Sequence, residues 1–232
     1  MKAEDTPNER RRVEELKSYE ILDTLPEKEY DDITTLASQL CGTPISLVSL
    51  IDDKRQWFKS RYGLEVAETP KEYAFCTHGI LAPNDVLVVN DSREDERFQG
   101  NPLVTGHPHV IFYAGVPLIN DNGFPLGSLC VIDHHKRTLT DDQIQALKVL
   151  SRQVVLLIET RKRNRILERL QMMLETRNDE LSGILKTVNK TIIPLANQID
   201  RKLSETPANN TRMILKNHME DLISLLTVIG EV

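Results

Sequence analysis

The chain has 232 residues, of which 40% are hydrophobic and 28% charged, and its formal net charge is −6. The composition supports a folded core, and the length favours one compact domain with an extension, or two small domains. No apolar run approaches the roughly 20 residues that span a bilayer, and the charged N-terminus lacks the apolar stretch of a signal peptide. These features predict a cytoplasmic protein.

The charge is unevenly distributed along the chain. Residues 1–160 contain 17 basic and 26 acidic residues, whereas residues 161–232 contain 12 basic and 9 acidic ones. The acidic first part disfavours a nucleic acid or an anionic membrane as a partner. The basic run RKRNR at residues 161–165 is the exception, and it predicts a solvated helix face.

Two helices are predicted first, followed by a series of strands. Residues 9–22 and 30–40 repeat apolar residues at helical spacing. After them come short runs rich in valine, isoleucine, leucine and aromatic residues, bounded by Gly, Asn, Asp or Pro, which predict strands. These runs are residues 44–52, 55–63, 85–91, 109–119 and 124–133. Residues 69–82, between the second and third runs, have a more helical pattern.

The last two strand runs are predicted to pair. Asn122 and Gly123 lie between them, and an Asn-Gly pair in this position is the strongest short-range signal for a hairpin. Residues 110–118 and 125–132 are therefore expected to be antiparallel neighbours. A long helix is expected next, over residues 140–202, with Thr140 as its N-cap residue.

A final helix is predicted after a turn, with Thr206 as N-cap and Pro207 at the first helical position. Its apolar residues follow a heptad spacing of four and three: Leu215, Met219, Leu222, Leu226 and Ile229. A hairpin of two helices alone has too little core to be stable. Two such hairpins from two chains would form a four-helix bundle, so the sequence predicts a homodimer.

Residues 10 to about 158 resemble a GAF domain. The segments that carry the resemblance are ILDTLPEKEYDDIT, PISLVSLIDDKRQWFKSRYGL, ETPKEYAFCTHGIL, VVNDSREDERFQGNPLVTG, IFYAGVPL and GSLCVIDHHKRTL. They are similar to the GAF type found at the N-termini of bacterial histidine kinases and diguanylate cyclases. The resemblance implies an α+β fold, with a central antiparallel sheet flanked by helices and a small molecule bound between the sheet and the loops over one face.

Residues 178–232 resemble the dimerisation hairpin of histidine kinases. In that hairpin a Pro-Leu pair follows shortly after the phosphoacceptor histidine. Pro194 and Leu195 of VNKTIIPL match the pair, and Asn189 occupies the place of the histidine. An amide is no substitute for the imidazole nucleophile, so Asn189 marks a degenerate phosphoacceptor position. A proline that merely kinks a long helix is the alternative interpretation. The predicted domains are thus 1–158 (GAF sensor), 159–177 (helical linker) and 178–232 (hairpin).

The GAF resemblance implies a ligand pocket, and its candidate residues are Trp57, Phe75, Cys76, His78, Asp91, Phe112 and Tyr113. Cys76 and His78, in FCTH, could instead be plain packing residues, or a metal or redox pair. For Asp91 and Arg97, a salt bridge that fixes the loop is favoured over ligand contact. His218, on the last helix, is expected at the surface.

No metal or cofactor is predicted, although the identity of a small ligand stays open. Cys41, Cys76 and Cys130 are odd in number and lack a C-x-x-C pair, which is typical of reduced thiols rather than of a disulfide or zinc framework. A closed zinc site would need four ligands, and no second pair is spaced to complete one.

The sequence predicts a non-enzymatic signalling module. The GAF part would sense a ligand, and the long helix would carry the change to a dimeric hairpin that binds a protein partner. Two alternatives remain open. One GAF branch reduces free methionine sulfoxide with cysteine chemistry, and other members bind haem or a chromophore.

Overall fold

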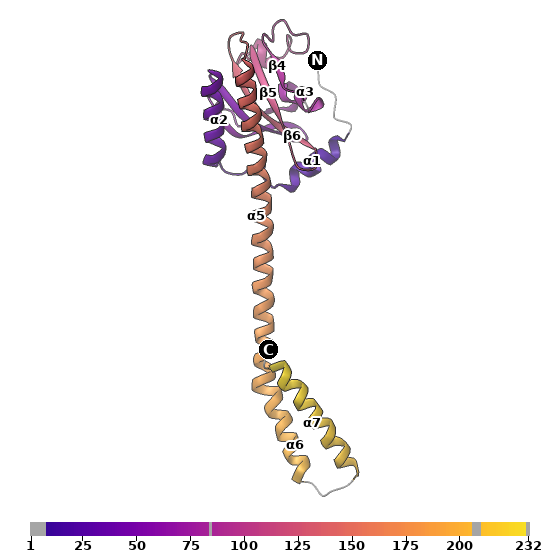
Figure 1. Cartoon of the computed structure of the whole chain (residues 1–232). Coiled ribbons are helices and arrows are strands. Elements are labelled where there is room, and N and C mark those ends of the chain that lie inside the picture. Colours follow the sequence, from indigo (N-terminus) through magenta and orange to yellow (C-terminus); the bar gives the residue numbers. More distant parts are fainter. Residues whose placement is uncertain (1–7, 84, 206–209, 231–232) are drawn as a thin grey trace. The chain divides into compact units, whose positions relative to one another are not determined.

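The computed structural model describes residues 8–83, 85–205 and 210–230. It divides into two compact units, Met1–Arg165 and Ile166–Val232. The first unit contains the sheet and the second contains helices (Figure 1).

The described part of the first unit contains one six-stranded sheet in which all pairs of neighbouring strands are antiparallel. Its strand order is β3-β2-β1-β6-β5-β4. The strands are β1 (Ile45–Ile51), β2 (Arg55–Tyr62), β3 (Glu68–Pro70), β4 (Leu87–Val89), β5 (Phe112–Ile119) and β6 (Pro125–Asp133). The fold is therefore α+β, as predicted from the sequence.

Both faces of the sheet are covered. The helices of this unit are α1 (Glu9–Ser18), α2 (Lys28–Cys41), η1 (Lys71–Tyr73), α3 (Phe75–Leu81), α4 (Pro102–Thr105) and the first part of α5 (Asp141–Thr187). Residues of α1, α2 and α5 share one apolar core with the sheet, which we call the helix-side core. Residues of α3, α4 and the neighbouring loops share the other, which we call the loop-side core.

Side chains alternate between the two cores because successive residues of a strand point to opposite faces. On β5, Phe112 and Ala114 belong to the helix-side core, whereas Tyr113 belongs to the loop-side core. On β2, Trp57 and Phe58 are divided in the same way. This division decides which residues can reach a ligand on either face.

Local signals in the sequence explain several element ends. The Asn122-Gly123 turn joins β5 to β6, with Gly123 at φ 80°, and confirms the predicted hairpin. Thr140 Oγ1 accepts a hydrogen bond from the N–H of Gln143 at 3.2 Å, and Gln143 Oε1 accepts one from the N–H of Thr140 at 2.9 Å. This reciprocal pair is a capping box, so the predicted N-cap of the long helix is confirmed.

In the second unit, the helix continues from the rest of α5 through the π-helix η2 (Val188–Ile192) into α6 (Ile193–Glu205). Helix α6 packs against α7 (Asn210–Gly230). The π-helix ends at Ile192, two residues before Pro194. Because proline cannot donate to the preceding turn, a widened turn at this point accommodates the missing bond without ending the helix.

Two segments differ from the sequence interpretation, and one prediction lies outside the described residues. Residues 69–82, predicted as mainly helical, form the end of β3, then η1 and α3. The short helix α4 was not predicted. The cap residues Thr206 and Pro207 lie outside the described residues.

A glycine at the centre of the sheet is required by packing. A Cβ at Gly127 would lie 1.9 Å from the carbonyl oxygen of Ser49, whereas one at Gly100 would meet nothing within 4 Å. We expect Gly127→Ala to lower the free energy of unfolding by about 3 kcal/mol, since the neighbouring strand must move. Gly100→Ala is the control and should change it by less than about 0.5 kcal/mol.

Urea unfolding followed by the fluorescence of Trp57, the chain's single tryptophan, would measure both variants. Equal stability of Gly127→Ala and the parent chain would contradict the strand packing described above.

Candidate ligand cavity and its link to helix α5

A cavity of about 150 Å³ lies on the loop side of the sheet. Its floor consists of Leu47, Phe58, Tyr113 and Ile132, which come from four different strands and share one face. Helix α3 contributes Phe75 to its wall. The remaining lining residues are Gln56, Leu64, Val66, Glu68, Thr69, Leu103, His107, Pro108 and Val110. The lining is mainly apolar, as in most small-molecule sites.

Stacked aromatic rings hold the wall of the cavity in place. The rings of Phe75 and Phe98 are parallel, with centroids 4.0 Å apart, and Phe75 is tilted against Tyr113 at 5.2 Å. His78 contacts the ring of Phe98 edge-on at 4.8 Å. Helix α3 is thereby fixed by Phe75 to both the sheet and the loop that carries Phe98.

A few polar groups are available at the cavity. Gln56 Oε1 accepts a hydrogen bond from Thr69 Oγ1 at 3.1 Å, which leaves the amide nitrogen of Gln56 as a donor. Glu68 is held by Arg55 at 2.5 Å. The ring of His107 completes the set of polar lining residues. Such an arrangement suits a small, mainly apolar molecule with one or two polar atoms.

A buried polar cluster lies in the loop-side core, on the same face of the sheet as the cavity. The hydroxyl of Tyr113 lies 3.3 Å from Ser128 Oγ, which lies 3.2 Å from Ser49 Oγ. The thiols of Cys76 and Cys130 complete the cluster, and neither is exposed. Burial raises the pKa of Cys76 to about 12 and raises that of Cys130 as well. Thiols in this state are poor nucleophiles at neutral pH.

The structure places the predicted pocket residues at different sites. Phe75 and Tyr113 line the cavity. Trp57 and Phe112 lie on the opposite face, in the helix-side core, because each precedes a cavity-lining residue on its strand. Cys76 is buried in the loop-side core without lining the cavity, and His78 packs edge-on against Phe98. The residues predicted as one pocket therefore occupy both faces of the sheet.

Two predicted polar residues take part in local ion pairs. Asp91 binds Arg93 at 2.6 Å, and Arg97 binds Asp95 at 2.6 Å. The guanidinium of Arg93 lowers the pKa of Asp91 to about 2. These pairs stabilise the loop, as expected, although Asp91 and Arg97 do not bind each other. His218 is exposed, as predicted, and Asn189 is exposed within the π-helix.

Among the described residues, no group of three or more His, Cys, Asp or Glu side chains is arranged to hold a metal ion. Over the same residues, every helix is too short or too polar to cross a bilayer.

A set of polar contacts ties α5 to the N-terminal segment, and we call it the helix clamp. It consists of five residues of α5 and their partners in residues 15–27 and 120–121. The α5 residues are Glu159, Arg161, Lys162, Arg163 and Arg165. The predicted solvated face at residues 161–165 is thus corrected, because four of its five side chains bind acidic groups.

Glu27 is the shared partner at the inner side of the clamp. Its Oε1 accepts from Lys59 Nζ of β2 at 2.6 Å and from Arg161 of α5 at 2.6 Å. The side chain of Lys59 is 0% exposed. It also donates to Thr24 Oγ1 and to the carbonyl of Leu25. One carboxylate therefore connects a strand of the sheet to the helix.

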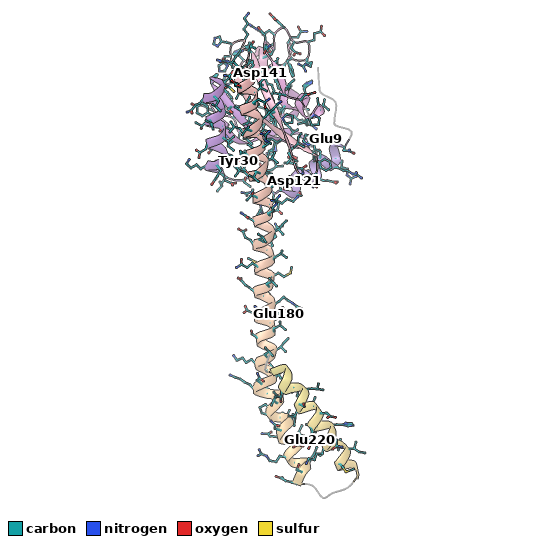
Figure 2. All side chains as sticks on the ribbon, viewed as in Figure 1. Glu9, Tyr30, Asp121, Asp141, Glu180 and Glu220 are labelled. Atoms are coloured by element: carbon teal, nitrogen blue, oxygen red, sulfur yellow. The ribbon has the colours of Figure 1, made fainter. Side chains whose placement is uncertain are left out.

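Tyr19 provides a second buried connection. Its hydroxyl donates to Glu159 Oε1 at 2.6 Å and accepts from Asn120 Nδ2 at 3.0 Å. Burial and the carboxylate of Glu159 both raise the pKa of Tyr19. At the outer side, Lys162 binds Glu15 at 3.4 Å, Arg163 binds Asp121 (labelled in Figure 2) at 3.1 Å, and Arg165 pairs with Glu20.

Comparison with known proteins identifies relatives of this chain. A model of the GAF domain matches residues 26–158. A protein of Pseudomonas aeruginosa named as a cyclic di-GMP phosphodiesterase is 35% identical over 196 residues, which cover 80% of this chain and 33% of the relative. The chain thus spans about a third of that relative's length. Residues 1–158 make up only about two thirds of the chain, whereas the match covers 80% of it. The match therefore extends beyond residues 1–158 into the long helix.

Solved structures resemble the chain at lower identity. The GAF domain of Thermosynechococcus elongatus PixJ, in its blue-light absorbing form, is 16% identical with a TM-score of 0.50, covering 71% of this chain and 96% of that one. The GAF domain of an Acinetobacter phosphoenolpyruvate-protein phosphotransferase is 14% identical with a TM-score of 0.48, covering 65% and 94%. At such identities the likeness to PixJ shows the fold alone.

The relative from Pseudomonas aeruginosa requires one correction. The sequence predicted a module that is not an enzyme, on the basis that Asn189 replaces a phosphoacceptor histidine. The relative is named as an enzyme and shares 35% identity over 80% of this chain. The prediction of a non-enzymatic protein is therefore wrong.

The shared carboxylate of the helix clamp leads to a prediction about stability. Glu27→Gln leaves the ammonium of Lys59 buried without a counter-charge, so we expect a loss of about 3 kcal/mol in the free energy of unfolding. Glu29→Gln, on the exposed side of the same helix turn, is the matched control and should have little effect. Urea unfolding of the two variants measures the difference. If both variants lose equal stability, Glu27 does not compensate the charge of Lys59.

Proposed function

The chain belongs to the GAF domain family, and on that premise we propose that it senses a small molecule in its cavity and thereby controls the hydrolysis of cyclic di-GMP. The observation that carries this proposal is the connection from the cavity to α5. Phe58 lines the cavity, and the next residue, Lys59, shares Glu27 with Arg161 of α5.

The proposed ligand is smaller than a nucleotide. Pockets for drug-sized ligands measure roughly 300–1,000 Å³, whereas this cavity measures about 150 Å³. Cyclic di-GMP is far too large for it, so the sensed molecule and the regulated nucleotide are different compounds. The apolar lining and the amide of Gln56 favour a compact molecule that has an apolar body and a hydrogen-bonding end.

The proposed relay runs through the helix clamp. A ligand that moves β2 also moves Lys59. Glu27 can then keep its hydrogen bond to only one of its two partners, Lys59 or Arg161. Because a buried ammonium without a counter-charge is costly, Glu27 follows Lys59 and the contact to α5 changes. Two discrete arrangements of this kind are what a signalling switch needs.

The proposed output is a homodimer formed by the helical segment. Within the described part of the second unit, large apolar side chains are mostly uncovered: Ile166, Leu170, Leu174, Leu181, Ile184, Ile192, Leu195, Leu222 and Leu225 are each at least 40% exposed. Val188 and Ala196 are buried there. Exposed apolar surface of this extent is typical of a protein interface, and a second copy offers a matching one.

The hairpin of α6 and α7 would then serve as the dimerisation element of the histidine-kinase type, with Asn189 at the degenerate phosphoacceptor position. The π-helix ahead of Pro194 supports this reading, since such helices mark functional positions. The link to cyclic di-GMP rests on the relative, and the extension of that match into the long helix supports a shared relay. A cytoplasmic location remains our expectation.

Native mass spectrometry tests the sensing step. We expect the purified chain to appear as a dimer that retains a small organic molecule. Val66 lines the cavity and is 47% exposed, so Val66→Trp should fill the cavity without unfolding the protein and should abolish the retained mass. Leu36→Trp, at a residue of α2 that is 43% exposed, is the control. An equal retained mass in both variants would mean that the molecule binds elsewhere.

Cellular levels of cyclic di-GMP test the output. Bacterial cells that produce the parent chain should differ in cyclic di-GMP from cells that produce Val66→Trp, when both proteins are present in equal amounts. Cells that produce Leu36→Trp should match those with the parent chain. Identical cyclic di-GMP in all three cultures would contradict a role in its turnover.

A further inference from the structure

The charges at the rim of the loop-side cavity are out of balance. Glu68 lines the cavity, and its Oε2 accepts from Arg55 Nη1 at 2.5 Å. The same guanidinium binds Asp23 at 2.6 Å and Asp52 at 3.5 Å. One positive charge therefore faces three negative ones. A molecule that binds beside Glu68 meets a negative potential, which favours a cation and opposes an anion.

The cavity itself offers little to offset this charge. Among the described lining residues, none is lysine or arginine, and His107 is the one whose ring could become a cation. One imidazole does not outweigh the excess of carboxylates around Arg55. A carboxylate or phosphate in this cavity would lose its hydration without gaining a cationic partner, which is costly. The lining thus disfavours an anionic ligand.

Glu68 keeps one oxygen available to a ligand. Its Oε2 accepts from Arg55, whereas no hydrogen bond from another described residue reaches its Oε1. The side chain is 50% exposed, so a ligand can replace water at this oxygen and leave the pair with Arg55 in place. An ammonium group has three donors and no acceptor. Thr69 Oγ1 donates to Gln56 Oε1 at 3.1 Å and still has a lone pair that can accept from such a group.

The aromatic residues of the cavity also suit a cation. Phe58, Phe75 and Tyr113 line it, and the ring centroids of Phe75 and Tyr113 are 5.2 Å apart. The face of an aromatic ring attracts a cation that lies within about 6 Å of its centre. Leu47 and Ile132 supply apolar surface for the rest of the molecule. Aromatic rings beside a carboxylate are the composition of a site for an organic ammonium ion.

The volume of the cavity limits the size of that ion. The cavity measures about 150 Å³, and a water molecule occupies roughly 30 Å³ of liquid, so about five non-hydrogen atoms fit. A short alkylamine has this size. A free amino acid adds a carboxylate, and the described lining provides no lysine or arginine to bind it.

We propose that the cavity binds a small organic amine in its protonated form, with Glu68 as the counter-charge of the ammonium group. This inference rests on the proposed sensing function and names the chemical class of the ligand. Glu68 is then the residue that distinguishes an amine from a neutral molecule of the same shape. The rival class is a neutral alcohol whose oxygen accepts from the amide nitrogen of Gln56.

Three probes of similar shape and different charge test the proposal on the full chain at neutral pH. They are isobutylamine, isobutanol and isobutyrate, and ligand-observed NMR measures the dissociation constant of each. We expect the amine to bind about ten times more tightly than the alcohol, because a partly exposed ion pair and a cation–π contact both favour it. Isobutyrate should bind more weakly than either. Val66→Trp, which fills the cavity, should abolish binding of the amine.

Glu68→Gln tests the assigned residue, and Glu65→Gln is its matched control. Glu65 is exposed on the same segment and does not line the cavity. We expect Glu68→Gln to bind the amine no more tightly than the alcohol, and Glu65→Gln to keep the preference of the parent chain. Unchanged binding of the alcohol by Glu68→Gln would show that the cavity is intact in that variant.

The outcomes separate this proposal from the sensing function. If the alcohol or isobutyrate binds the parent chain as tightly as the amine, and Val66→Trp abolishes that binding, the ammonium assignment is overturned and the sensing cavity stands. A preference for the amine that is equal in Glu68→Gln and Glu65→Gln, or that persists in Val66→Trp, would also overturn the assignment. Failure of all three probes to bind the parent chain would overturn both the assignment and the cavity as a sensing site.

Discussion

The organisation of this protein depends on a sheet that is buried on both faces. Each strand has to supply two cores with side chains at alternate positions, and the strands β1, β5 and β6 are buried along nearly their whole length. The helix-side core fixes α1, α2 and α5 to one face, and the loop-side core leaves room for the cavity on the other. Neighbouring residues of one strand, such as Phe58 and Lys59, therefore belong to different sides of the molecule. Phe58, which lines the cavity, is therefore followed directly by Lys59, which is connected to α5 through Glu27.

Polar contacts are concentrated where this coupling occurs. The apolar contacts of α5 with the sheet end near Ile158, and the helix clamp follows at once. Apolar packing is tolerant of small sliding movements, whereas a carboxylate shared by Lys59 and Arg161 is specific in geometry and costly to break. The clamp thus makes the last turns of α5 in this unit more sensitive to the position of β2 than packing alone would.

Much of the fold could be predicted from the sequence because its signals are local. The Asn122-Gly123 hairpin, the capping box at Thr140 and the strand-like runs each depend on neighbouring residues. The cavity could be predicted only in part. Phe75 and Tyr113 line it, but Trp57 and Phe112 face the other way, and the sequence has no marker for which face of a doubly buried strand is open. Alternation could have shown that Trp57 and Phe58, and likewise Phe112 and Tyr113, face opposite sides, but which of each pair faces the cavity depends on the register between strands. The pairing of the basic residues 161–165 was not predictable, because their partners are more than 130 positions away for Glu27 and Glu20.

The π-helix at Val188–Ile192 has a consequence for how such chains can change over time. A π turn holds one residue more than an α turn, so it is in effect a single inserted residue that the helix has absorbed. Because the extra residue is held within one wider turn, deleting one residue there would restore a regular helix and leave the residues after it at nearly the same angle around the axis. The same deletion in a regular α-helical turn would rotate everything after it by about 100°. The π turn is thus the position of this helix where the chain can shorten by one codon with the least change in the face that α6 presents.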